Sequence, residues 1–140
     1  MGDTITLHGT AVALDGRAVL IRGRSGTGKS ALALQLIALG AMLIADDQVV
    51  LTRRGDDVIA SCPPALRGVI EARGMGILRA RPTGPAPLAC VVDLDTTEVA
   101  RLPEWHSITL VGCAVPLFQK PPYIDLAAAL MIYLRGGRSA

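Results

Sequence analysis

A glycine-rich loop carries the clearest chemistry in the sequence. Residues 23–30 read Gly-Arg-Ser-Gly-Thr-Gly-Lys-Ser, which matches the phosphate-binding loop pattern. Gly23, Gly26 and Gly28 permit backbone angles that turn successive N–H groups toward a polyphosphate. Lys29 can reach the terminal phosphates, and Ser30 can ligate Mg²⁺. The predicted phosphate-binding residues are Gly23, Arg24, Ser25, Gly26, Thr27, Gly28, Lys29 and Ser30.

Phosphoryl transfer also needs a carboxylate for the metal or the acceptor, and two places supply one. Asp46-Asp47 follow the apolar run 41–45, and Asp93 follows the apolar run 88–92, so both lie at predicted strand ends. Adjacent strand residues face opposite ways, and neighbouring carboxylates disfavour each other's charged form, which suits one of a pair to proton transfer. We therefore favour the pair for chemistry. The alternatives are a metal-only or capping role for the pair and a turn role for Asp93.

A histidine and a glutamate are further candidates. His8 stands 15 residues before Gly23 and could hydrogen-bond a phosphate or the acidic pair if the opening strands lie beside the loop, although its type alone does not decide this. Glu71 interrupts an otherwise apolar run, which favours a metal site over a solvated face. Arginines surround it at Arg67, Arg73, Arg79 and Arg81. They form either a charged surface or, at Arg73, a phosphate contact.

A strand, a loop and a helix must position these residues. Alternation over 4–14 and an apolar run over 17–21, separated by Asp15-Gly16, predict an opening hairpin. Leucines at helical spacing predict a helix over 29–39 that Gly40 ends. Further strands are predicted over 41–45, 49–52, 58–61, 88–92, 108–111 and 115–118, a strand with a shaped loop over 68–78, loops over 62–66 and 81–87, and a helix over 123–135.

Composition excludes several classes of function. The chain has 140 residues, the size of one domain, and its net charge of +2 without a basic run argues against nucleic-acid binding. With 51% hydrophobic and 19% charged residues it can bury a substantial core, which excludes extensive disorder. No apolar stretch reaches the roughly 18 residues of a membrane span, and the start of the chain does not read as a signal peptide. We therefore expect a cytoplasmic protein without a membrane partner.

The three cysteines are spaced for packing rather than for chemistry. Cys62, Cys90 and Cys113 are odd in number, far apart and without a Cys-x-x-Cys pair. This pattern predicts a reducing compartment and neither a disulfide framework nor a zinc site.

Four segments together resemble the HPr kinase/phosphorylase family. They are His8-Gly9, the loop 23–30, Leu43-Ile-Ala-Asp-Asp47 and Ile70-Glu-Ala-Arg-Gly-Met-Gly-Ile77. The last resembles that family's own signature and is not part of the general phosphate-loop repertoire. The resemblance spans His8 to about Lys120. It implies an α/β fold of the PEP-carboxykinase-like, P-loop-containing type with a central mixed sheet, and we expect residues 1–140 to form one catalytic domain with a frayed tail at 136–140.

The resemblance also implies an activity. Members of the family are serine kinases that use ATP and Mg²⁺ to phosphorylate the phosphocarrier HPr of a bacterial phosphotransferase system. They also run a phosphate-dependent reverse reaction that releases pyrophosphate. Partners implied for this chain are an HPr-type carrier, a nucleotide and further copies of the chain, with a hexamer as one oligomer.

Residue roles carry over position by position. The implied catalytic residues are His8, Lys29, Asp46, Asp47 and Arg101. By this resemblance Asp47 would take the proton from the acceptor serine, with His8 beside it and Asp46 in support. Lys29 would bind the β-phosphate, while Ser30 and Glu71 would hold Mg²⁺. Arg101 resembles the family's later catalytic arginine.

Departures from the family pattern leave alternatives open. Only seven residues precede His8, so we expect a short form without the family's N-terminal domain. Ala31 follows Ser30 where the family often has glutamate, and the segment linked to dephosphorylation reads Val115-Pro-Leu-Phe-Gln-Lys120, with one cation. The reverse reaction, a non-catalytic nucleotide sensor and a kinase acting on another substrate therefore all remain to be tested.

Overall fold

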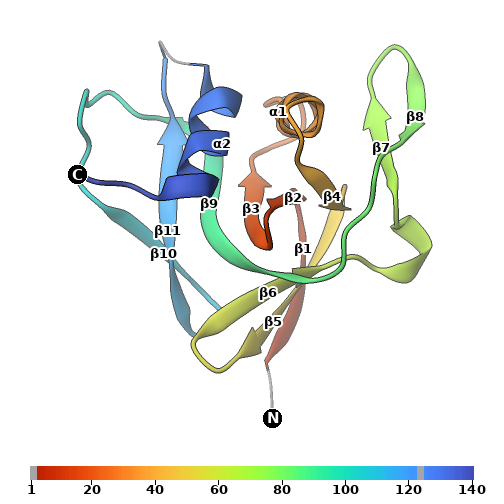
Figure 1. The fold of residues 1–140 in the computed structure, drawn as a ribbon, viewed down its shortest axis with the longest axis horizontal. Helices are drawn as coiled ribbons and strands as arrows, with labels where there is room; N and C mark the ends of the chain where they lie inside the picture. The colour runs from red at the N-terminus through yellow and green to blue at the C-terminus, as the bar shows by residue number, and fades with distance from the viewer. Residues whose placement is uncertain (1–2, 123–124) are drawn as a thin grey trace.

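Helices α1 and α2 cover one face of a curved mixed β-sheet in the computed structural model (Figure 1), which describes residues 3–122 and 125–140. The helices are α1 (Lys29–Ala38) and α2 (Leu126–Gly136), with one 3₁₀ turn, η1 (Pro64–Leu66). The strands are β1 (Thr4–His8), β2 (Thr10–Leu14), β3 (Arg17–Arg22), β4 (Met42–Ala45), β5 (Gln48–Arg54), β6 (Asp57–Ser61), β7 (Val69–Ala72), β8 (Gly76–Arg79), β9 (Ala86–Thr97), β10 (His106–Leu110) and β11 (Cys113–Lys120). This arrangement confirms the α/β class.

The long strand β9 is the centre of the sheet. The strand order is β1-β5-β6-β9-β3-β2-β4, and β9 also pairs with β11, which in turn pairs with β10. Strands β3 and β11 run parallel to β9, whereas all the other pairings are antiparallel. The sheet is therefore mixed, and the carboxyl ends of β3, β9 and β11 meet at one edge.

Alternating residues of the central strands face two separate cores. Val19 and Ile21 of β3 pack beneath the two helices, whereas Leu20 between them faces the core enclosed by the curled strands. Leu36 of α1 and Leu134 of α2 are almost fully buried against the first core. Burying each such side chain contributes about 1.5–3 kcal/mol, so the helices are held mainly by this packing. Neither helix among the described residues has the length and apolarity needed to cross a bilayer.

The predicted helix after the glycine-rich loop is confirmed. α1 runs over Lys29–Ala38 and buries Leu32, Ala33 and Leu36 on its sheet-facing side. The chain turns away at Gly40, whose φ of 113° lies in the left-handed region that favours glycine. The strands predicted over 49–52 and 58–61 are also present, as β5 and β6, which pair antiparallel.

Two strand predictions were wrong in their boundaries. The stretch 4–14 is not one strand of a hairpin: it divides at Gly9, so that β1 pairs with β5 while β2 pairs with β3 and β4. A Cβ at Gly9 would lie 3.0 Å from the carbonyl oxygen of Ile21, and this close approach lets the chain cross between the two halves of the sheet. The strand predicted over 88–92 continues to Thr97, so Asp93 does not stand at its end.

Other predictions differ in detail. The stretch 68–78, predicted as a strand with a shaped loop, is the separate hairpin β7–β8. The second helix begins at Leu126, with the Asp125 side chain accepting a hydrogen bond from the Ala128 N–H at 3.1 Å. Its predicted start at 123 lies outside the described residues. Cys90 and Cys113 are buried free thiols and Cys62 is half-buried, as the packing prediction requires.

Candidate active site

A cleft of about 440 Å³ joins the glycine-rich loop to the acidic residues. Its walls come from the loop and the start of α1, the end of β1, the end of β4 and the β7–β8 hairpin. Nine of the predicted site residues line it together: His8, Ser25, Gly26, Gly28, Lys29, Ser30, Asp46, Asp47 and Glu71. They come from segments up to about sixty residues apart, so the fold rather than sequence proximity assembles the site.

The loop is closed around its lysine. The Lys29 Nζ donates to the carbonyl oxygens of Gly23 and Arg24, at 2.7 and 3.0 Å. The Thr27 hydroxyl also donates to the Arg24 carbonyl, at 2.7 Å. A Cβ at Gly23 would lie 2.5 Å from the Thr27 hydroxyl oxygen, so this turn requires glycine. The loop thus holds the Lys29 ammonium at its centre, where it could contact a bound phosphate.

Strand β9 anchors the outer side of the loop through Asp95, a residue that the sequence reasoning missed. The Asp95 Oδ1 accepts hydrogen bonds from the Arg24 backbone N–H at 2.9 Å and from the Arg24 Nε at 3.2 Å. The backbone bond, followed by the side-chain bond and the nearby charges, lowers the pKa of Asp95 below its ordinary value. Its position two residues after Asp93, in phase along the strand, is the signal that could have found it.

Asp46 is held by three hydrogen bonds in the floor of the cleft. Its Oδ1 accepts from the Thr10 hydroxyl at 2.9 Å and from the Ser30 hydroxyl at 3.2 Å, and its Oδ2 accepts from the Glu71 backbone N–H at 3.1 Å. Thr10 is not among the residues predicted from the sequence. Among the described residues, Thr10 is the one polar residue that is buried, with 1% of its surface exposed. A buried hydroxyl aimed at a carboxylate fixes that carboxylate in one orientation.

Asp47 lies at the open side of the cleft beside His8. The His8 Nδ1 and the Asp47 Oδ1 are 3.3 Å apart, and both side chains are about 60% exposed. Asp47 has a φ of 74°, in the left-handed region that few residues other than glycine adopt. Its backbone carbonyl accepts a hydrogen bond from the Gly9 N–H at 3.1 Å. This turn directs neighbouring carboxylates differently, so that Asp46 is bound within the site while Asp47 faces solvent.

The oxygen donors of the cleft fit a magnesium ion that also binds phosphate. No group of three or more His, Cys, Asp or Glu close enough to hold a metal occurs in residues 3–122 and 125–140. Mg²⁺ at nucleotide sites, however, commonly takes one or two carboxylates together with substrate phosphates and water. The Ser30 hydroxyl and the carboxylates of Asp46 and Glu71 line one cleft and supply such a set.

Two predicted candidates lie elsewhere. Arg101 does not line this cleft and instead lines a second cavity beside α2. The Asp93 carboxylate accepts hydrogen bonds from its own strand, from the Asp95 backbone N–H at 2.8 Å and from the Thr96 hydroxyl at 3.4 Å. Of the four clustered arginines, Arg73 alone is among the residues that line the cleft. Of the two predicted strand-end sources, the acidic pair and not Asp93 therefore lines the cleft beside the loop.

Comparisons with known proteins agree in one family. The model of the HPr Serine kinase C-terminal domain matches residues 1–83. A HPr kinase/phosphorylase from Alkaliphilus metalliredigens (strain QYMF) is 41% identical over 109 residues, which are 76% of this chain and 35% of that protein. One from Nitrosomonas europaea is 46% identical over 82 residues, 58% of this chain and 25% of that protein. The chain thus spans about a third or less of these relatives' length.

A solved structure has a similar fold over most of the chain. The chain is similar to the Hpr(Ser) kinase/phosphatase from Coxiella burnetii, with a TM-score of 0.77 and 25% identity, over 94% of each chain. The similarity therefore extends beyond the loop and acidic pair to the described strands and helices on the carboxyl side of residue 83.

Proposed function

The chain belongs to the HPr Serine kinase C-terminal domain family, and from that premise we propose that its cleft transfers the terminal phosphoryl group of ATP to a serine of an HPr-type carrier protein. One observation carries the proposal: a phosphate loop and two aspartates, one fixed inside and one exposed beside a histidine, line a single cleft. Binding alone would not need the exposed carboxylate. Transfer to a hydroxyl does.

The loop and its lysine would bind the nucleotide phosphates. Backbone N–H groups at the start of α1 carry the partial positive charge of a helix N-terminus, and Lys29 adds a full charge. On phosphate binding, Lys29 would exchange its bonds to two loop carbonyls for bonds to phosphate oxygens. Because the loop is already closed before the nucleotide binds, its residues lose little conformational entropy on binding.

Ser30, Asp46 and Glu71 would hold Mg²⁺ beside those phosphates. The ion, when bound, supplies charge neutralisation on the phosphate oxygens. Thr10 and the Glu71 N–H fix the Asp46 carboxylate independently of any ligand, so this donor is in place before the nucleotide arrives.

Asp47 would act as the base. Its exposed position lets a serine hydroxyl on the surface of another protein reach it. The serine proton would pass to the Asp47 carboxylate as the serine oxygen forms its bond to the γ-phosphorus and the bond to ADP breaks. His8, 3.3 Å away, would orient Asp47. In the same cleft the phosphoryl group of the phosphoserine would pass to inorganic phosphate to form pyrophosphate, while the leaving serine oxygen takes a proton back from Asp47.

Intact mass spectrometry of an HPr-type carrier tests the proposal. The carrier is incubated with the chain, Mg²⁺ and ATP, and excess phosphate is then added. We expect a gain of one phosphoryl group at serine that phosphate reverses. Asp47→Asn should bind ATP with unchanged affinity but transfer nothing. A carrier left unmodified by a chain that binds ATP would instead support a nucleotide sensor or a different substrate.

A further inference from the structure

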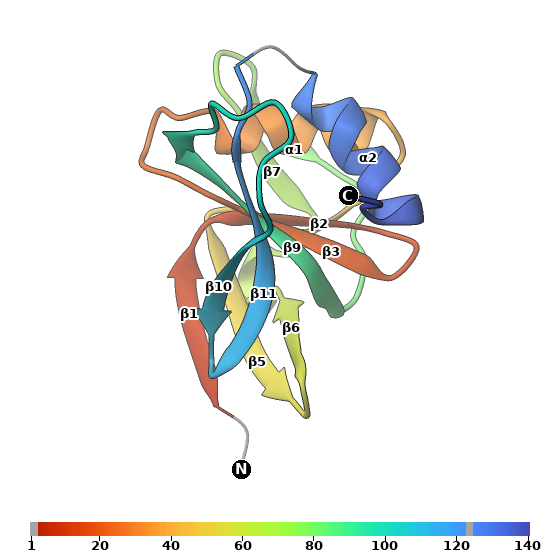
Figure 2. The same ribbon diagram turned by 90° about the vertical axis from the view of Figure 1, so that its left-hand side faces the viewer.

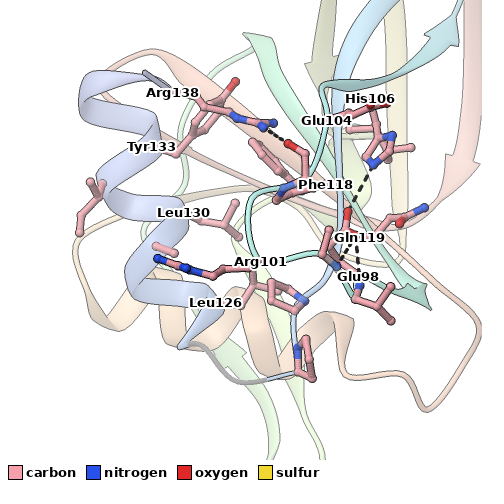
Figure 3. Close-up of a pocket in the computed structure, with 18 of the residues that line it drawn as sticks. Glu98, Arg101, Glu104, His106, Phe118, Gln119, Leu126, Leu130, Tyr133 and Arg138 are labelled. Atoms are coloured by element: carbon pink, nitrogen blue, oxygen red, sulfur yellow. Dashed lines mark hydrogen bonds and ion pairs between the residues drawn. The ribbon is translucent and has the colours of Figure 1, made fainter. Parts of the chain in front are cut away.

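A second cavity, of about 630 Å³, lies between α2 and the carboxyl ends of β9 and β11 (Figure 3). It is larger than the cleft, and its volume lies in the range typical of small-molecule sites. None of its lining residues belongs to the set that lines the cleft. The functions proposed above leave this space unassigned.

The position of the cavity relates it to the phosphate loop. The loop follows the carboxyl end of β3, and the cavity rim follows the carboxyl ends of β9 and β11, both of which run parallel in this part of the sheet. In α/β sheets, ligands bind across the carboxyl ends of neighbouring parallel strands. Figure 2 shows the end of β9 beside the orange loop that precedes α1. The loop and the cavity therefore share one edge of the sheet.

Hydrogen bonds link the loop to the cavity rim along β9. The Arg24 N–H of the loop binds Asp95, and Glu98, three residues further along, lines the cavity. Three residues of extended chain span about 10 Å, a distance comparable to the length of a nucleoside. The Glu98 N–H also donates to the Lys120 carbonyl at 2.8 Å, which joins the ends of β9 and β11 at the rim.

The lining suits a flat, partly apolar group. Phe118 and Tyr133 meet edge to face with their ring centroids 4.9 Å apart, and Leu126 and Leu130 of α2 line the same cavity (Figure 3). The Tyr133 hydroxyl is already satisfied by the Ala89 carbonyl at 3.1 Å. Such walls offer apolar contact to the faces of a heterocyclic base.

The polar groups at the rim suit a ligand that carries negative charge at one end. The Glu98 carboxylate already has partners, since it lies 3.2 Å from the His106 Nε2 and accepts hydrogen bonds from the backbone N–H groups of Val99 and Ala100. These bonds, the Ala100 N–H first, lower the pKa of Glu98. Arg101 is exposed at the cavity wall and forms no ion pair with any other described residue. Its guanidinium is therefore available to an anionic chain that leaves the loop.

We propose that this cavity takes the base and ribose of the nucleotide whose phosphates occupy residues 23–30. The inference rests on the proposed function, because it extends the same nucleotide from the loop across the ends of β9 and β11. It assigns substrate recognition to α2 and to the segment 98–106, neither of which contributes to the cleft.

Isothermal titration calorimetry with ATP and with inorganic tripolyphosphate, each with Mg²⁺, separates base recognition from phosphate recognition. Ala129→Phe places a ring in the cavity from α2. Ala128→Phe is the matched control, because Ala128 is equally half-buried on the same helix but does not line the cavity. We expect Ala129→Phe to weaken ATP binding at least tenfold and to leave tripolyphosphate binding within twofold. Ala128→Phe should leave both within twofold.

The outcomes distinguish the two proposals. ATP affinity within twofold of the parent in Ala129→Phe, or an equal loss for ATP and tripolyphosphate, would overturn the base site while leaving the phosphate loop standing. A parent chain that binds neither ligand would overturn both proposals.

Photo-cross-linking of the unmodified chain with 8-azido-ATP, followed by peptide mapping, tests the inference without any variant that must fold. We expect label in peptides containing residues 98–106 or 117–133. Label confined to other peptides would contradict the assignment.

Discussion

Replacing Thr10 by valine tests how the buried floor of the cleft works. Valine has nearly the same shape but lacks the hydroxyl that donates to Asp46 at 2.9 Å. A hydrogen bond to a charged group contributes about 1.5–3 kcal/mol, and the site is 1% exposed, so water does not replace the bond easily. We expect the free energy of unfolding to fall by about 2 kcal/mol, and the urea midpoint to fall by about 1 M at a typical slope of about 2 kcal/mol/M.

The same change should loosen the carboxylate proposed to hold Mg²⁺. Groups that orient a metal ligand typically cost 10–100-fold in metal affinity when they are removed, so the Mg²⁺ concentration for half-maximal carrier phosphorylation should rise by about tenfold or more. Thr10→Ser is the control. It loses a buried methyl group, at a cost of about 1 kcal/mol, but keeps the hydroxyl, so its Mg²⁺ dependence should match the parent.

Equal shifts of the Mg²⁺ dependence in Thr10→Val and Thr10→Ser would refute a role for the hydroxyl, because the effect would then be one of packing. That role is also refuted if Thr10→Val matches the parent in both stability and Mg²⁺ dependence.

Three further predictions concern the loop and the core. Lys29→Ala should weaken ATP binding measured by calorimetry at least tenfold, and unchanged affinity would remove the phosphate-loop assignment. Asp95 has a lowered pKa in the folded chain, so its stabilisation is complete above its unfolded value of about 3.9 and is lost as pH falls through the folded value. Urea unfolding at pH 5 and pH 3 should therefore show a smaller acid loss in Asp95→Asn than in the parent, and equal losses would contradict the anchor to Arg24. Burial raises the pKa of Cys90 to about 12, so iodoacetamide at pH 8 should label Cys62 well before Cys90 in the folded chain, and equal labelling rates would refute that burial.

The local patterns of the sequence predicted most elements, because glycine turns and apolar periodicity act within a few residues. The helix over 29–38 and the hairpin over 48–61 follow from such signals. The break at Gly9 does not, since it depends on a carbonyl of β3 that approaches from another part of the sheet. The extension of β9 past Asp93 likewise depends on pairing with β11, in which Gln119 and Lys120 pair with Asp93 and Thr97 from more than twenty residues further along the chain.

The site shows the same division. Residue types and spacing identified Lys29, Ser30 and the acidic pair, because phosphate chemistry restricts those choices. They could not indicate which aspartate is held inside, since that follows from a turn at Asp47 with a φ of 74°. Nor could they find Thr10, because a threonine at the start of an apolar strand acquires its role only when β4 brings Asp46 beside it.

The most direct test of the central claim is a crystal structure of the chain with Mg²⁺ and a non-hydrolysable ATP analogue. The account predicts β- and γ-phosphates bound within residues 23–30, the metal in contact with Ser30 and a cleft carboxylate, and the γ-phosphate facing Asp47. Phosphates bound outside the loop, or a γ-phosphate turned away from Asp47, would contradict it.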